Sequence, residues 1–265
     1  MTLMDNPVAL VTGAARGIGA ATVDALVSDG WRVVATDACG SGAATSYRQP
    51  TEADLRAVVS THESAAEAHV LDVRDGTAVA AVVSDVVDRH GRLDCLVAAA
   101  GIVAGGVPLW EIADEEWAAV LDTDLTGVWH TVRAAAPHIL TAPGPGRVVV
   151  VASAGGSLGL RHMGAYAAAK HGVIGLVRSL AADLAGTGVT ANAVSPGSTR
   201  TPILDASAAI YGLDDPSEFV VHQEPLGRLI EPAEVAATIA WLCSDAAAAI
   251  TGAVVPVDGG MTATN

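Results

Sequence analysis

The sequence predicts an α/β fold in which helices pack against a parallel sheet. Short apolar runs alternate with longer helical stretches, from a first strand expected at Pro7–Thr12 to a last one expected at Ala253–Val257. Apolar residues make up 51% of the 265 residues but aromatic residues only 3%. A core of alanine and valine suits helices that cover a parallel sheet. The length fits one large domain over residues 1–265, without repeats or linkers.

Composition also narrows the classes of partner. The formal net charge of −15 disfavours nucleic acid and anionic membrane surfaces as partners. We find no targeting leader before the first strand and no unbroken apolar run of transmembrane length, so a cytoplasmic protein is expected. The scattered cysteines Cys39, Cys95 and Cys243 lack metal-ligand spacing. We expect buried free thiols and no metal site.

A glycine-rich turn, TGAARGIG, follows the first strand and leads into a helix expected at Gly17–Ser28. The spacing G-x-x-x-G-x-G lets backbone come close to a ligand, and the helix N-terminus directs its amides at an anion. The turn therefore predicts a site for the pyrophosphate of a dinucleotide, with a ligand-free turn as the alternative. The contacts expected here are Gly13, Arg16, Gly17, Ile18 and Gly19.

The second strand, expected at Trp31–Thr36, ends at Asp37. A carboxylate in this position accepts hydrogen bonds from the adenosine ribose and repels a 2′-phosphate, so it favours NAD over NADP. Arg16 is a contrary sign, because an arginine in the glycine turn could meet a phosphate. An exposed aspartate that caps the next turn is the alternative interpretation of Asp37.

The connection to the third strand is long. Residues 38–54 are small, polar and rich in helix breakers, and a helical stretch follows at Glu52–Ser60. Long connections in such folds are often functional covers. The alternative is a plain surface insertion.

Two further strands are expected to end at residues that face a ligand. The third, His69–Leu71, is followed by Asp72, whose carboxylate can accept from an adenine amino group. The fourth, Leu93–Ala100, ends at Gly101 with a small surface on which a nucleotide can lie, although a merely buried strand would have the same composition. The cofactor contacts expected here are Asp72, Val73, Ala99, Ala100 and Gly101.

Ser153 follows the fifth strand, Arg147–Ala152. Ligands of open parallel sheets bind at the carboxyl ends of the strands, so this serine is expected on the cofactor side. A lone serine after a strand is usually a cap, but this one lies thirteen residues before Tyr166. A long helical stretch ahead of the strand, Glu115–Leu140, carries Asp124.

Tyr166 and Lys170 lie four residues apart in a helix expected at Met163–Leu184. Residues at this spacing share one helix face, and an ammonium close to a phenol favours the tyrosinate form. The pair predicts an acid–base site. Alone the motif is weak, since a tyrosine and a lysine on a solvated face have the same spacing; the other motifs, in order along the chain, give it weight.

After the sixth strand, Val189–Ser195, backbone amides and threonine hydroxyls are expected to hold the nicotinamide carboxamide. The sequence of residues 203–226 is irregular with scattered apolar side chains, which indicates a substrate lid over an apolar pocket. The last helix is expected at Glu231–Ser244. The cofactor contacts expected after the sixth strand are Pro196, Gly197, Thr199 and Thr201.

Taken in order, these motifs resemble the short-chain dehydrogenase/reductase family from about Val8 to Gly260. The resemblance implies a Rossmann-type doubly wound parallel sheet of about seven strands, with helices on both faces, that binds NAD(P). It also implies roles: Tyr166 as general acid/base, Ser153 as hydrogen-bond partner of the substrate oxygen, and Lys170 as the residue that holds the nicotinamide ribose and favours tyrosinate.

The chain departs from the family pattern twice. The family commonly has Asn-Asn-Ala-Gly after the fourth strand, where this chain has Ala98-Ala99-Ala100-Gly101, and an asparagine where this chain has Asp124. That asparagine normally holds a water that links the lysine to a proton relay. An aspartate can hold the same water, but its charge stabilises Lys170 and opposes tyrosinate. We expect altered pH dependence rather than inactivity.

Several segments resemble one subgroup of the family more closely. They are VAAAGI, AGGVPLWE, VSPGST and a later YGL, together with the extra segment after the second strand. This subgroup is associated with mycofactocin, a peptide-derived redox carrier, and is thought to hold NAD(H) without exchanging it. The resemblance implies that residues 38–52 cover and trap the cofactor.

The sequence thus predicts an NAD-dependent oxidoreductase that interconverts an apolar alcohol and its carbonyl compound. One alternative exchanges NAD(H) freely; a remote one is a nucleotide sensor whose chemistry has decayed. The long helices are apolar on more than one face, which predicts a homo-oligomer, and the family resemblance implies a tetramer. The substrate pocket is expected to be formed by Trp110, Leu160, Met163, Tyr211 and Phe219.

Overall fold

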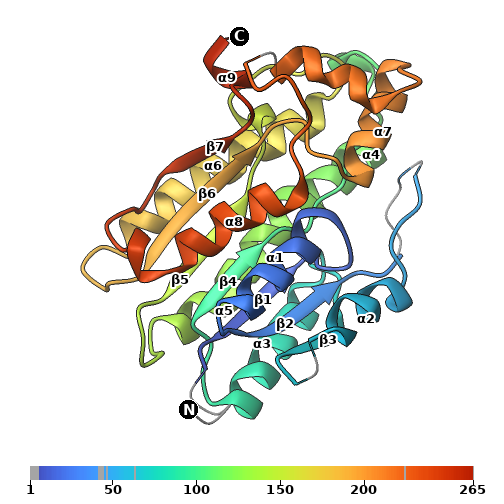
Figure 1. The fold of residues 1–265 in the computed structure, drawn as a ribbon. Coiled ribbons are helices and arrows are strands. Elements are labelled where there is room, and N and C mark those ends of the chain that lie inside the picture. The colour runs from blue at the N-terminus through green and yellow to red at the C-terminus, as the bar shows by residue number, and fades with distance from the viewer. Residues whose placement is uncertain (1–5, 41–44, 46, 63, 224, 265) are drawn as a thin grey trace.

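The computed structural model describes residues 6–40, 45, 47–62, 64–223 and 225–264 (Figure 1). Within them, seven parallel strands form one sheet in the order β3-β2-β1-β4-β5-β6-β7. The order reverses its direction between β1 and β4, which makes the sheet doubly wound. The predicted fold class is confirmed. The strands are β1 (Val8–Thr12), β2 (Arg32–Asp37), β3 (Ala66–Val70), β4 (Cys95–Ala98), β5 (Arg147–Val151), β6 (Thr190–Pro196) and β7 (Val254–Val257).

The central strands are continuous apolar runs because both of their faces are covered. Every residue of β1, β4 and β5 is buried, including Arg147 at the start of β5. The Arg147 guanidinium donates to the carbonyl oxygens of Gly146 and Ser244, so its charge is met by backbone dipoles. The strands therefore hold their carboxyl ends in fixed register at one edge of the sheet.

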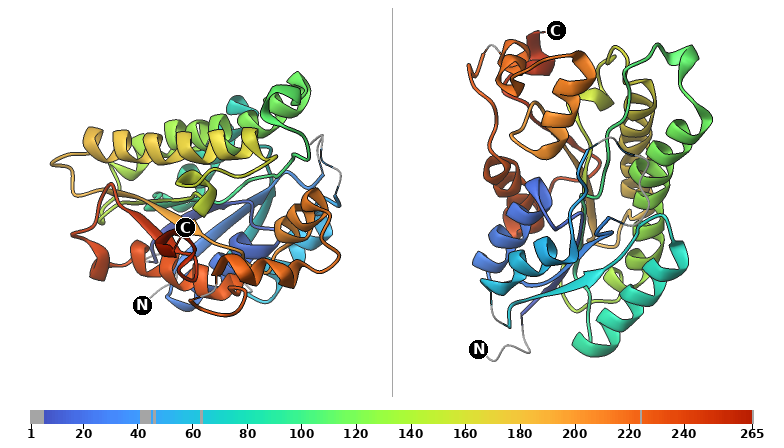
Figure 2. Two further views of the ribbon diagram at one scale, coloured as in Figure 1. Left: turned by 90° about the horizontal axis from the view of Figure 1, so that it is seen from above. Right: turned by 90° about the vertical axis from the view of Figure 1, so that its right-hand side faces the viewer.

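Helices form a layer on each face of this sheet, as Figure 2 shows. One core cluster joins one face of the sheet to α3, α5 and α6, and a second joins the other face to α1, α2 and α8. In the second layer α1 and α8 lie against each other. The helices of the two layers are α1 (Gly17–Ser28), α2 (Glu52–Ser60), α3 (Gly76–His90), α5 (Gly127–Ile139), α6 (Gly164–Asp183) and α8 (Pro232–Cys243).

The long helical stretch that the sequence predicts before β5 exists, with a change of winding inside it. Helix α4 (Asp114–Leu121) passes into a π-helical segment, Asp122–Thr126, and then into α5. A π-helical turn is often found at a functional site. It carries Asp124, and Gly127 follows it where a Cβ atom would lie 2.5 Å from Cγ2 of Val73.

The segment of residues 203–226, whose irregular sequence indicates a lid, is mostly helical. Helix α7 (Pro202–Tyr211) and a 3-10 helix (Pro216–Gln223) occupy most of it. Proline in the first turn of α7 and Gly212 in the left-handed conformation at its end are ordinary helix boundaries. Small residues between these boundaries obscure the helical period.

Two smaller expectations need correction. Strand β3 starts three residues earlier than predicted and ends one residue earlier, because it is an edge strand whose residues are mostly only half-buried. Cys95 and Cys243 are buried free thiols with their Sγ atoms 3.4 Å apart, but Cys39 is only partly buried. Among the described residues, no helix combines the length and apolarity needed to cross a membrane.

Candidate active site

A cavity of about 800 Å³ opens at the carboxyl ends of the strands. All nineteen residues that the sequence analysis selects for cofactor binding or catalysis line it, although they come from eight separate stretches of the chain. They are Gly13, Arg16, Gly17, Ile18, Gly19, Asp37, Asp72, Val73, Ala99, Ala100, Gly101, Asp124, Ser153, Tyr166, Lys170, Pro196, Gly197, Thr199 and Thr201.

The glycine turn is shaped by close packing as well as by its space for a ligand. Gly13 has φ +68°, and a Cβ atom there would lie 2.7 Å from the backbone of Ala100. A Cβ atom on Gly19 would overlap the carbonyl oxygen of Gly13. The absence of side chains leaves the first turn of α1 open to the cavity. Backbone amides at a helix N-terminus suit a pyrophosphate, so this cradle fits a dinucleotide.

Asp37 both lines the cavity and caps the adjoining turns. Its Oδ2 accepts from the amide of Ala15 at 3.2 Å, and its Oδ1 accepts from the amide of Cys39 at 3.1 Å. The capping interpretation and the ligand interpretation of Asp37 are therefore compatible. Backbone amides fix the carboxylate at the end of β2, where a nucleotide ribose would lie.

Arg16 is directed to the segment after β2. Its Nη1 donates to the carbonyl oxygen of Arg48 at 2.6 Å, and its guanidinium lies over the ring of Tyr47, 5.6 Å from the centroid. We call residues 47–50 the cover; Gln49 and Pro50 of the cover line the cavity beside Asp37. The cover thus borders the cofactor half of the site. Residues 41–44 and 46 of the predicted insertion lie outside the described residues.

Asp72 lies at the cavity wall with its carboxylate paired to Arg74. The Arg74 Nε is 2.9 Å from Oδ1 and 3.0 Å from Oδ2 of Asp72. This pair fixes the carboxylate at the end of β3. Val73 beside it is buried, and its carbonyl oxygen is 3.0 Å from Nδ1 of His130 on α5.

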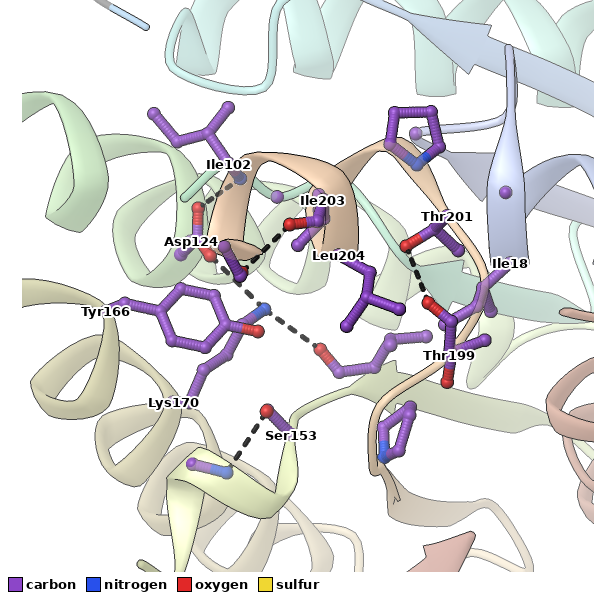
Figure 3. A pocket seen from close by; sticks show the side chains of 18 of the residues that line it. Ile18, Ile102, Asp124, Ser153, Tyr166, Lys170, Thr199, Thr201, Ile203 and Leu204 are labelled. Carbon is purple, nitrogen blue, oxygen red and sulfur yellow. Dashed lines mark hydrogen bonds and ion pairs between the residues drawn. The ribbon is translucent and has the colours of Figure 1, made fainter. Parts of the chain in front are cut away.

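Tyr166, Lys170 and Asp124 form the polar centre of the cavity (Figure 3). The Lys170 Nζ lies 5.6 Å from the centroid of the Tyr166 ring and 3.3 Å from Oδ2 of Asp124, and it donates to the carbonyl oxygen of Val151 at 3.2 Å. Oδ1 of Asp124 accepts from the amide of Ile102 at 2.8 Å. The side chains of Lys170 and Asp124 are 5% and 0% exposed.

Burial and charge shift the pKa values of Asp124 and Lys170 in opposite directions. Burial raises the pKa of Asp124, and the nearby Lys170 charge opposes that rise. Burial lowers the pKa of Lys170, but the charges of Asp124 and then Tyr166 raise it above the ordinary lysine value. Lys170 therefore keeps its proton at neutral pH, with Asp124 as its counterion.

Ser153 follows β5 at the same end of the cavity. Its Oγ accepts from the amide of Gly155 at 3.1 Å, which caps the short 3-10 turn Ala154–Gly156. Because the oxygen is the acceptor in this bond, its own proton is left to donate to another group. The cap orients that hydroxyl from a rigid strand end.

Small residues at the end of β4 form another wall. The amides of Ala99 and Ala100 both donate to Oγ1 of Thr12, each at 3.2 Å, which ties β4 to β1. On the opposite side, Oγ1 of Thr201 donates to the carbonyl oxygen of Thr199 at 3.2 Å. The alanines expose little polar surface, so this wall offers a flat apolar bed.

The substrate half of the cavity is mainly apolar. Four of the five predicted pocket residues line it, namely Leu160, Met163, Tyr211 and Phe219. Trp110 does not, because it is 83% exposed on the outside of the molecule, so that expectation is wrong. The sequence analysis missed several other lining residues, which stand in no recognisable motif: Leu158, Ser207, Glu218, Val221 and His222.

The fold and the site define a dinucleotide-binding oxidoreductase, since the doubly wound sheet, the glycine cradle and a Tyr–Lys pair meet in one cavity. The family model described as enoyl-(acyl carrier protein) reductase matches residues 13–262. The chain belongs to the short-chain dehydrogenase/reductase family, and it is an enzyme of alcohol and carbonyl oxidoreduction.

Three relatives illustrate this membership. The cis-4-hydroxycyclohexanecarboxylate dehydrogenase of Sinomonas cyclohexanicum is 41% identical, over 97% of this chain and 96% of that protein. The (-)-trans-carveol dehydrogenase of Rhodococcus erythropolis is 34% identical, over 99% of both chains. The crystal structure of carveol dehydrogenase from Mycobacterium avium in complex with NAD has a TM-score of 0.91 and 32% identity, over 97% of this chain and 98% of that one.

Proposed function

We propose that the protein interconverts an apolar alcohol and its carbonyl compound with NAD as cofactor, and that Tyr166 is the general acid/base. The observation that carries this proposal is the joint position of Tyr166, Lys170 and Ser153 at one end of a single cavity. The relatives named above act on alicyclic alcohols, to judge from their names. The apolar lining supports a substrate of that character.

Ser153, Tyr166 and Lys170 each have one role in the proposed reaction. The hydroxyl of Ser153 donates a hydrogen bond to the substrate oxygen and orients it. Tyr166 takes the hydroxyl proton in oxidation and returns it in reduction. The Lys170 charge stabilises tyrosinate. The nicotinamide cofactor, when bound, supplies the hydride acceptor or donor.

The test of the mechanism is Tyr166→Phe, which removes the phenolic oxygen and keeps the ring. Turnover of cis-4-hydroxycyclohexanecarboxylate or carveol should fall by at least about a thousandfold, near the loss typical of a missing acid–base group. Binding of NADH, followed by its fluorescence, should be retained. Substantial turnover in this variant would remove Tyr166 from the mechanism.

NAD is the proposed cofactor in preference to NADP. Asp37 carries a negative charge at the end of β2 that would repel a 2′-phosphate. Arg16, the contrary sign in the sequence, has its guanidinium engaged with Arg48 and Tyr47 of the cover. The NAD complex of the carveol dehydrogenase supports the same preference.

We further propose that the cofactor is held tightly and reoxidised by a separate carrier such as mycofactocin. The contacts between Arg16 and the cover support this, because they border the dinucleotide half of the cavity. The alternative is an ordinary dehydrogenase with diffusible NAD. Protein that has been exhaustively dialysed and then denatured should release about one equivalent of NAD(H) per chain; release of none supports the alternative.

The remaining expectations stay proposals. Trp117, Trp129 and Leu140 leave apolar surface exposed on or beside α4 and α5, which supports a homo-oligomer, with a tetramer as the family expectation. Light scattering gives the mass of the oligomer.

The free cysteines agree with a reducing compartment such as the cytoplasm, which cell fractionation tests. A decayed nucleotide sensor, the remote alternative, requires that no alcohol is turned over.

A further inference from the structure

Tyr47 is the point at which the cover reaches the substrate half of the site. Its ring packs against a cluster whose buried members are Val103, Met163 and Ala206. The cluster also contacts residues that line the substrate half, Leu160, Tyr166, Ile203 and Tyr211. A side chain of the cofactor cover therefore forms part of the packing behind the substrate wall.

The hydroxyl of Tyr47 fixes this position. Oη of Tyr47 accepts from the amide of Val103 at 3.2 Å, and the amide of the preceding residue, Ile102, donates to Asp124. Two consecutive backbone amides thus join the cover to the carboxylate that pairs with Lys170. Burial raises the pKa of Tyr47, so the phenol stays protonated at neutral pH.

The Tyr47 ring also contacts a residue of the cofactor half. The Arg16 guanidinium over the ring also donates to the carbonyl oxygen of Arg48, and Nη2 of Arg16 lies 3.4 Å from Oε1 of Gln49. Arg16 comes from the glycine turn, whose amides form the pyrophosphate cradle. Tyr47 is thus held between the glycine turn and the substrate wall.

We propose that Tyr47 is a positioning residue that couples the cover to the substrate wall, so that release of the dinucleotide depends on how that wall is packed. This rests on the proposed function, because it requires a dinucleotide under the cover. The cover opens only if the Tyr47 ring leaves the Val103 cluster and its hydroxyl leaves the Val103 amide. By linkage, a substrate that tightens this wall raises the affinity for the cofactor, and bound cofactor raises the affinity for the substrate by the same factor.

The experiment measures the rate of NADH release by stopped-flow fluorescence, with excess NAD as the chase. Tyr47→Ala should speed release by roughly tenfold, within the usual range of coupling between sites. Tyr47→Phe, which keeps the ring and loses the hydroxyl, should show a smaller increase of about threefold. Arg56→Ala on the adjoining helix α2 is the control: its side chain is exposed and lies outside the cover, so release should be unchanged.

A double-mutant cycle separates coupling from a local effect on the cover. Val103 does not line the cavity, so Val103→Ala acts through the packing of the cluster that it shares with Tyr47. It should speed NADH release by about threefold in the natural background and leave it unchanged in the Tyr47→Ala background. The melting temperature of each variant is measured as well. A lower melting temperature, in the double variant as in the single ones, identifies general destabilisation.

Three results would overturn the proposal. The first is a rate of NADH release that Tyr47→Ala leaves unchanged, and the second is a rate that Val103→Ala leaves unchanged. The third is that the effects of the two substitutions multiply in the double variant. Failure of the natural protein to bind NADH at all would instead refute the proposed function, and the coupling with it. If NADH binding and alcohol turnover are normal but the two substitutions act independently on NADH release, the coupling alone is refuted.

Discussion

The carboxylate of Asp124 lies 3.3 Å from the ammonium of Lys170, and both groups are almost completely buried. An asparagine is the usual residue of the family at the position of Asp124. The substitution puts a carboxylate beside Lys170, the lysine that we propose to assist Tyr166. Lys170 therefore has its own counterion inside the protein.

Asp124→Asn should move the pH profile of alcohol oxidation to lower pH. Removal of the carboxylate removes a charge that raises the pKa of Lys170. The pKa of Lys170 should therefore fall, and the loss of rate that follows its deprotonation should begin at lower pH. The measurement is kcat/KM between about pH 6 and 10. Asp114→Asn, an exposed acidic residue on α4, is the control; identical profiles for both variants would disprove a role for the Asp124 charge.

Lys170→Met should destabilise the fold as well as abolish activity. It leaves the Asp124 carboxylate buried without a counterion, which typically costs about 3–5 kcal/mol. Lys170→Met combined with Asp124→Asn should recover part of that loss, because an amide needs no counterion. Urea unfolding of both variants provides the comparison. Equal stability of the single and double variants would mean that the ion pair contributes nothing to the fold.

The sequence predicted those parts of the fold and site that have a strong local signal. Strands β1 and β5 are apolar runs because they are buried on both faces, and Tyr166 and Lys170 lie on a helix with clear boundaries. The glycine turn is visible because only glycine fits at Gly13 and Gly19.

What was missed depends on contacts between distant segments. Tyr47 lies in a polar segment and acquires its position from Val103, 56 residues away. Helix α7 carries alanine and serine, whose pattern has little amphipathic contrast. Trp110 is expected in the pocket but is 83% exposed, because the hydrophobicity of a side chain does not say whether it faces the cavity or solvent.

Asp37→Ser should relax the preference for NAD. The hydroxyl can still accept from the backbone amides that Asp37 caps, but the charge that would repel a 2′-phosphate is gone. The ratio of kcat/KM for NAD to that for NADP should fall by roughly 10- to 100-fold, which corresponds to about 1.4–2.8 kcal/mol. Titration of both cofactors with one alcohol gives this ratio. An unchanged ratio would show that another residue excludes NADP.

Gly105→Ala should raise KM for the alcohol with little effect on NAD binding. The amide of Gly106 donates to the carbonyl oxygen of His162 at 2.9 Å, and a Cβ atom on Gly105 would overlap that same oxygen. His162 has φ +58°, so the loop before α6 has little freedom to adjust.

The loop that the Gly105→Ala side chain would displace carries Leu160 and Met163, which line the substrate half of the cavity. The glycine cradle lies at the other end. An increase in KM of about tenfold corresponds to a loss of about 1.4 kcal/mol in binding. The control is Gly175→Ala on α6, where a Cβ atom meets no neighbouring atom within 4 Å, so it should leave KM unchanged. The two KM values, measured with NAD in excess, decide the matter: if Gly105→Ala keeps the natural KM, the loop does not shape the substrate pocket.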